Sequence, residues 1–172
     1  MDDASQKNAA FELIQKGLTY IGENKIKEAV DCFQRSIEIC KTPEGYTYWG
    51  WAVSFYKKFD EAIFLCKKAI GMDPDFGNPY NDIGCYLVEL GDFDQAIEWF
   101  EKAKSAKRYE TRYFPYLNLG RLYLKNSDIE KAKKEFLEVI NLSPFNLEAQ
   151  KALYRISCLE GKNKHFYFCS LN

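Results

Sequence analysis

The fold of this chain is decided by residues 80–103, which read Tyr80-Asn-Asp-Ile-Gly-Cys-Tyr-Leu-Val-Glu-Leu-Gly-Asp-Phe-Asp-Gln-Ala-Ile-Glu-Trp-Phe-Glu-Lys-Ala103. The spacing of their apolar residues predicts two short amphipathic helices, with a break at Gly91-Asp92. Gly84 and Ala96 stand where two such helices must approach each other. Glycine inside a helix costs roughly 1 kcal/mol relative to alanine, so its presence indicates close packing against a partner helix.

The same pattern occurs four times along the chain. The repeated glycines are separated by 33, 34 and 36 residues and are Gly17, Gly50, Gly84 and Gly120. The repeated alanines keep the same spacing and are Ala29, Ala62, Ala96 and Ala132. Four residues after each alanine come, in order, Phe33, Cys66, Phe100 and Phe136. A period of this length indicates an array of helical hairpins in which each unit packs on its neighbours.

This arrangement resembles the tetratricopeptide repeat family, whose unit is a helix–turn–helix of 34 residues. The resemblance covers about residues 9–144 and implies an all-α, right-handed superhelical solenoid of four repeats with a C-terminal capping helix. The expected repeats are 9–42, 43–76, 77–112 and 113–146, followed by a capping helix at 146–160. The candidate contacts of this helix with the apolar face of the last repeat are Leu147, Leu153 and Ile156. Together the repeats and this helix form one expected domain, 1–160, and residues 161–172 are a tail.

Local signals place the individual helices. The expected hairpins pair residues 8–22 with 26–40, 44–56 with 60–72, 77–89 with 93–107, and 111–125 with 129–141. Asp92 with Gln95, and Asp128, are the expected N-terminal caps of two second helices. Lys16 replaces a large apolar residue in the first repeat, as expected of a solvent-facing end unit. Two extra residues within 105–112 predict a local irregularity between the third and fourth repeats.

Composition argues against several functional classes. The chain has 24 basic and 25 acidic residues, so it lacks the positive excess of a nucleic-acid-binding protein. No signal peptide and no membrane-spanning run are apparent, and the expected location is therefore cytoplasmic. The 6 cysteines form no C-x-x-C pair and are expected to be small buried hydrophobic residues. The only histidine is His165, and no phosphate-binding glycine motif occurs, so we predict no enzyme activity, metal or cofactor.

In the tetratricopeptide family, the first helices of the repeats line a concave groove that binds protein segments. Carried over by repeat position, the resemblance predicts a groove with an aromatic end, an amide middle and a basic end. The predicted partner-binding residues are Thr47, Tyr48, Trp51, Phe55, Asn78, Asn81, Cys85, Asn118, Arg121, Lys125 and Arg155. We expect a peptide with an apolar residue near Trp51 and an acidic residue near Arg121. The alternative for Trp51 and Phe55 is packing against neighbouring helices alone.

Some family members hold chaperone C-termini, of the Glu-Glu-Val-Asp type, through a clamp of lysine, arginine and asparagine. Neither register of this chain matches that clamp. The positions are Ile14, Leu18, Tyr48, Asn78 and Asp82 in repeats one to three, and Thr47, Trp51, Asp82, Phe114 and Asn118 in repeats two to four. We therefore predict a protein-interaction adaptor with a different protein or peptide ligand. The alternative function is a chaperone similar to the class II chaperones of type III secretion.

The tail carries two further hypotheses. Residues 169–172 have the layout of a prenylation signal, but asparagine is not a usual final residue, so docking of the tail is the preferred interpretation. Phe166, Tyr167 and Phe168 are unusually apolar for a free terminus. They predict docking into a groove of the same chain, or a homodimer through the C-terminal helix or tail.

Overall fold

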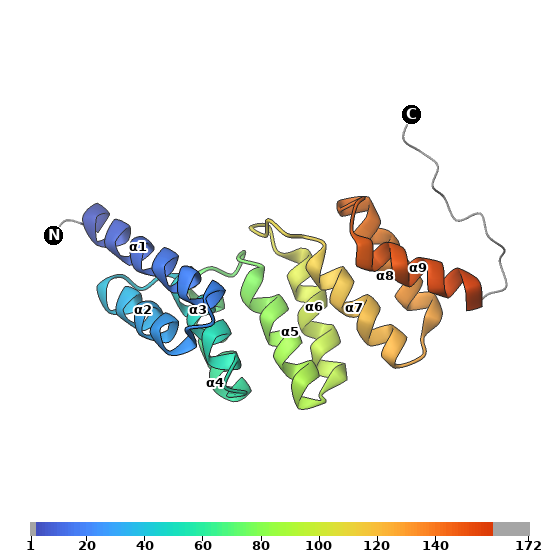
Figure 1. Ribbon diagram of the computed structural model, residues 1–172, viewed down its shortest axis with the longest axis horizontal. Helices are drawn as coiled ribbons and strands as arrows, with labels where there is room; N and C mark the ends of the chain where they lie inside the picture. The colour runs from blue at the N-terminus through green and yellow to red at the C-terminus, as the bar shows by residue number, and fades with distance from the viewer. Residues whose placement is uncertain (1–2, 160–172) are drawn as a thin grey trace. The chain divides into compact units, whose positions relative to one another are not determined.

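The computed structural model describes residues 3–159, and its regular secondary structure in that range is α-helical (Figure 1). The helices are α1 (Asp3–Gly22), α2 (Ile26–Ile39), α3 (Pro43–Ser54), α4 (Phe59–Met72), α5 (Asn78–Leu90), α6 (Phe93–Ser105), α7 (Phe114–Lys125), α8 (Ile129–Leu142) and α9 (Leu147–Leu159). The predicted all-α repeat fold is confirmed. Most predicted boundaries agree within two residues, whereas α1 begins five residues earlier than expected and α7 three residues later.

The chain divides into two compact units, Met1–Tyr109 and Glu110–Asn172, which we describe separately. In the first unit, α1 pairs with α2, α3 with α4, and α5 with α6. The first helices α1, α3 and α5 contact one another in sequence, and α2 also contacts α3, as α4 contacts α5. In the second unit, α7 pairs with α8, and α9 packs on α8.

The helix ends have local causes. Proline occupies the first turn of α3, α5 and α7, where its missing N–H group costs nothing. The predicted caps are confirmed, since Asp92 Oδ1 accepts from the Gln95 N–H at 3.2 Å and Asp128 Oδ1 accepts from the Lys131 N–H at 3.2 Å. Gly91 ends α5 with a left-handed φ of 83°, a conformation that favours glycine.

The repeated glycines make room for a phenylalanine ring. A Cβ atom on Gly17, Gly84 or Gly120 would lie 2.5 Å, 2.5 Å and 2.8 Å from the rings of Phe33, Phe100 and Phe136, respectively. These three rings are almost completely buried. The expected contact between glycine and alanine is therefore corrected: the ring four residues after the alanine fills the space opposite each of these glycines.

In the second hairpin, a cysteine rather than a phenylalanine lies opposite the repeated glycine. Cys66 replaces the phenylalanine there, and a Cβ atom on Gly50 would meet the Ala62 carbonyl oxygen at 3.0 Å and Cys66 Sγ at 3.4 Å. The smaller side chain thus lets the backbone of α4 come close to α3. Cys66 and Cys32 are buried as predicted, but Cys158 is exposed, so the prediction that all cysteines are buried is wrong. Cys169 lies outside the described residues.

Helix α9 covers the apolar face of α8. Leu153 and Ile156 are buried with Phe136 and Val139 in one cluster, as the sequence predicted. Leu147 was also expected in this contact, but its side chain is 68% exposed. The prediction failed for Leu147 because it lies about half a helical turn from the buried face, which Ala149 begins. Lys16 at the other end of the array is exposed, as predicted.

Candidate protein-binding surface

A ladder of aromatic rings runs along α3 in the first unit. The ring centroids of Phe33 and Tyr48 are 5.9 Å apart, those of Tyr48 and Trp51 6.5 Å, and those of Trp51 and Phe55 5.7 Å. Tyr48 and Trp51 are half-buried, and Phe55 is 50% exposed. The buried end therefore packs on the core, while the Phe55 end offers apolar surface to a ligand.

The predicted amide middle lies deeper than expected. Thr47 is 2% exposed, and its hydroxyl donates to the Pro43 carbonyl oxygen at 2.8 Å. Asn81 is 8% exposed, and its amide lies 4.0 Å from Cys85 Sγ. Asn78 and Cys85 are half-buried. A ligand in this part of the first unit can thus reach Asn78 and Cys85 more easily than Thr47 or Asn81.

Asp82 is a half-buried carboxyl next to Asn81 on α5. Burial raises the pKa of its carboxyl to about 7, and a hydrogen bond from Asn81 opposes that shift. Burial raises the pKa of the Cys66 thiol and of the Tyr86 hydroxyl, and the nearby Asp82 carboxylate adds a smaller increase to both. Part of the carboxyl is therefore protonated at neutral pH. In the sequence, Asp82 stands out only as a residue that does not fit a carboxylate clamp.

The second unit holds the predicted basic residues, but Arg121 already has an acidic partner. Its guanidinium donates to both carboxylate oxygens of Glu148 on α9, and to Asn118 Oδ1 at 2.9 Å. The hydrogen bond from Arg121 holds the pKa of Glu148 below its usual value. Lys125 and Arg155 are exposed. An acidic ligand of Arg121 must therefore replace Glu148 or share the guanidinium with it.

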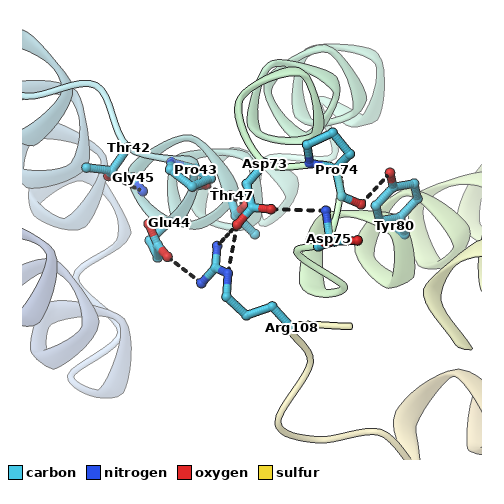
Figure 2. A network of polar contacts seen from close by, with 10 residues as sticks. All are labelled: Thr42, Pro43, Glu44, Gly45, Thr47, Asp73, Pro74, Asp75, Tyr80 and Arg108. Atoms are coloured by element: carbon cyan, nitrogen blue, oxygen red, sulfur yellow. Dashed lines mark hydrogen bonds and ion pairs between the residues drawn. The ribbon is translucent and has the colours of Figure 1, made fainter. Parts of the chain in front are cut away.

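Figure 2 shows a polar network in the first unit that sequence analysis missed. Arg108 reaches Glu44 of α3 at 2.7 Å and Asp73, at the end of α4, at 2.8 Å. Its guanidinium lies 4.0 Å from the centroid of the Phe76 ring. These partners are 64 and 35 residues away along the chain, so no local pattern could reveal them.

The backbone completes this clasp, which we define as residues 106–109 together with their contacts to Glu44 and residues 73–77. Arg108 N–H donates to the Asp75 carbonyl oxygen at 2.9 Å, and Gly77 N–H donates to the Arg108 carbonyl oxygen at 3.0 Å. Tyr109 is buried against Gly77, where a Cβ atom would lie 2.5 Å from its ring. The segment that departs from the repeat length thus ties the second and third hairpins of the first unit together.

Replacing Arg108 with glutamine is expected to lower the free energy of unfolding by about 1 kcal/mol, because two ion pairs and a ring contact are lost together. The Arg108 hydrogen bond lowers the pKa of Asp73, so this contribution is present above the ordinary pKa of an aspartate and is lost as the pH falls through the lowered value. Urea unfolding of the variant and the unmodified chain at neutral and at acidic pH measures both effects. The control is Lys107→Gln, whose exposed pair with Asp75 spans 3.4 Å; an equal loss in both variants would contradict the clasp.

Residues 3–159 lack both a membrane-spanning helix and a cluster of metal-binding side chains. No helix within residues 3–159 has the length and apolar character needed to cross a membrane. The same residues contain no group of three or more histidine, cysteine, aspartate or glutamate side chains that could hold a metal ion. His165 and the prenylation-like residues 169–172 lie outside the described residues.

The sequence model of the tetratricopeptide repeat family matches residues 13–43, 78–109 and 115–146, which is more than half of the chain. The chain belongs to the tetratricopeptide repeat family. The three matches coincide with the first, third and fourth predicted repeats. The family pattern misses the second repeat, yet α3 and α4 form the same hairpin there.

Relatives and solved structures agree with this assignment. The chain is 27% identical to the heat shock protein STI1 of Saccharomyces cerevisiae over 55% of its own length and 16% of that protein. It is 25% identical to the mitochondrial import receptor subunit TOM70 of Homo sapiens over 84% of its own length and 24% of that protein. The structure of PilF from Pseudomonas aeruginosa has a TM-score of 0.85 at 19% identity, covering 92% of this chain and 72% of that one. The chain thus spans less than a quarter of either relative's length, and the PilF similarity establishes the fold alone.

Proposed function

We propose that this tetratricopeptide repeat chain is a non-catalytic scaffold that binds a segment of a partner protein on the first helices of its repeats. The observation that carries the proposal is the aromatic ladder on α3, which ends in the half-exposed ring of Phe55. Aromatic side chains of this kind are common anchors of protein interfaces. TOM70, whose name identifies a receptor subunit, supports a role in holding other proteins.

The proposed ligand is a peptide segment with an apolar residue that packs near Trp51 and Phe55. Asn78 and Cys85 are the proposed polar contacts of this ligand in the first unit. In the second unit, taken by itself, Lys125, Arg155 and Arg121 are proposed as contacts of an acidic segment. A chaperone C-terminus of the Glu-Glu-Val-Asp type is not the proposed ligand, because Asp82 occupies a position where the clamp needs a basic or amide side chain. Thr47 and Asn81 are buried and lie beneath the proposed binding surface.

Replacing Trp51 with alanine is expected to reduce partner capture more than about tenfold, because truncating an aromatic anchor costs 2 kcal/mol or more. Affinity purification with quantitative mass spectrometry measures the effect. The control is Phe64→Ala, which removes an exposed ring from α4, a second helix. Circular dichroism checks that both variants keep their helices.

The same experiment tests the basic contact through Arg121→Ala. Because the Arg121 guanidinium already pairs with Glu148, Arg121→Ala is expected to reduce partner capture less than Trp51→Ala does. The proposal fails if Trp51→Ala retains its partners, or if Phe64→Ala loses the same partners to the same extent.

A further inference from the structure

Helices α7 and α9 of the second unit carry basic side chains on both sides of one ion pair. On α7, Arg121 and Lys125 are exposed one turn apart, and the helix has no acidic residue. On α9, Lys151 and Arg155 are exposed, and Glu148 is the one acidic residue of the helix. Residues 148, 151 and 155 are three and four apart, so they share one face of α9. The two faces that the ion pair joins therefore hold four basic side chains and a single carboxylate.

Glu148 contacts Arg121 in the way that a ligand carboxylate would. Its two oxygens accept from Nε and Nη2 of the guanidinium, and Asn118 Oδ1 accepts from Nη1 at 2.9 Å. This two-point geometry is the one by which arginine recognises carboxylates with the greatest specificity. The same hydrogen bond lowers the pKa of Glu148, which keeps its carboxylate ionised at neutral pH. A ligand carboxylate that uses this edge of the guanidinium therefore competes with Glu148.

The ion pair between Arg121 and Glu148 can open without disturbing the core. The two side chains are 51% and 48% exposed, and ion pairs this close to water contribute little to stability. A released Glu148 also keeps favourable surroundings. It lies in the first turn of α9, where the N–H groups of the helix favour negative charge, and Lys151 follows three residues later on the same face. Exchange of Glu148 for another carboxylate therefore has a small free-energy cost.

We propose that Glu148 is an internal competitor of the ligand, and that a partner segment rich in aspartate or glutamate binds the second unit by replacing Glu148 on Arg121. This inference rests on the proposed scaffold function and adds the chemistry and the regulation of its basic contacts. Lys125, Lys151 and Arg155 bind the neighbouring carboxylates of the same segment. Glu148 lowers the affinity of every acidic ligand, so a segment with one isolated acid binds poorly and a run of acids is selected.

Fluorescence anisotropy of a fluorescein-labelled tetraglutamate peptide, titrated with the full-length chain, tests the competition. Glu148→Gln is expected to raise the affinity at least about threefold, because it removes the competing carboxylate and keeps the size of the side chain. In the Arg121→Gln background, the same change is expected to alter the affinity by less than about twofold, since the contested guanidinium is gone. The matched control is Glu130→Gln, which removes an exposed acid from α8 and is also expected to stay within about twofold.

Three outcomes overturn the proposal. An unchanged affinity of Glu148→Gln means that Glu148 does not compete with the ligand. An equal gain in Glu130→Gln, or a gain that persists without Arg121, means that the net charge of the unit controls binding. Equal binding of a tetraglutamine peptide means that the site does not recognise carboxylates. None of these measurements involves the aromatic ladder or a natural partner, so the scaffold function fails separately, through partner capture that survives Trp51→Ala.

Discussion

Replacing Gly84 with alanine is expected to lower the free energy of unfolding by about 1–3 kcal/mol, although alanine is the better helix former by roughly 1 kcal/mol. The added Cβ atom would lie 2.5 Å from Phe100 Cε1 and 2.6 Å from Cδ1. Phe100 is 1% exposed, so its ring cannot move aside into solvent. The overlap must open the contact between α5 and α6. Urea unfolding followed by circular dichroism measures the change.

Gly71 near the end of α4 provides the matched control. No atom lies within 4 Å of a Cβ built on Gly71, so Gly71→Ala is expected to leave stability unchanged or raise it by up to about 1 kcal/mol. A second variant tests the mechanism. Phe100→Leu destabilises by itself, but Gly84→Ala should cost less in that background, because the smaller side chain leaves room for the methyl group. Additive effects of the two substitutions would contradict the proposed overlap.

Replacing Asp82 with asparagine is expected to raise the free energy of unfolding at pH 8 by about 2 kcal/mol. The difference between a pKa of about 7 and the ordinary value of 3.8 corresponds to at most about 4 kcal/mol. The side chain keeps part of its surface in water, which lowers the expected effect to about half. The gain arises because asparagine removes the cost of holding a charged carboxylate in a poorly solvated place.

The pH dependence gives the sign of this effect. Between about pH 4 and pH 7 the folded state keeps a proton on Asp82 that the unfolded state releases, so stability falls as the pH rises through this range. Urea unfolding at pH 5 and pH 8 should therefore show a larger difference for the unmodified chain than for Asp82→Asn. Glu89→Gln, which changes an exposed acid on the same helix, should retain the original difference. If Asp82→Asn retains it as well, the Asp82 carboxyl is not its source.

The hairpin of α3 and α4 shows what the repeat spacing reveals and what it does not. The spacing of glycine and alanine located every hairpin, including α3 and α4, which the family pattern misses. The same spacing could not show that a phenylalanine ring, rather than the alanine, contacts the glycine in three hairpins. Periodicity shows which face of a helix is buried, whereas the identity of the contacting atoms depends on the distance between helices.

The candidate binding residues also differ in how well the sequence alone could place them. The aromatic ladder on α3 is local, because residues three and four apart on a helix are neighbours, and the predicted Trp51 and Phe55 do lie side by side. Thr47 and Asn81 were placed on the groove by repeat position, but their depth depends on helices elsewhere in the chain. Both residues therefore lie beneath the proposed surface and not on it.

By itself, the sequence determined the helical repeat, the number of hairpins and most helix ends, because these follow from spacings within about 34 residues and from local capping chemistry. Only the tertiary structure decided which charges are paired. Arg121 lies on Glu148, and Arg108 lies between Glu44 and Asp73, through contacts 27 to 64 residues apart. It also decided that Asp82 is half-buried and that Leu147 of α9 is exposed. Such properties depend on which helices come together in space, and the spacing of residues within one helix does not contain that information.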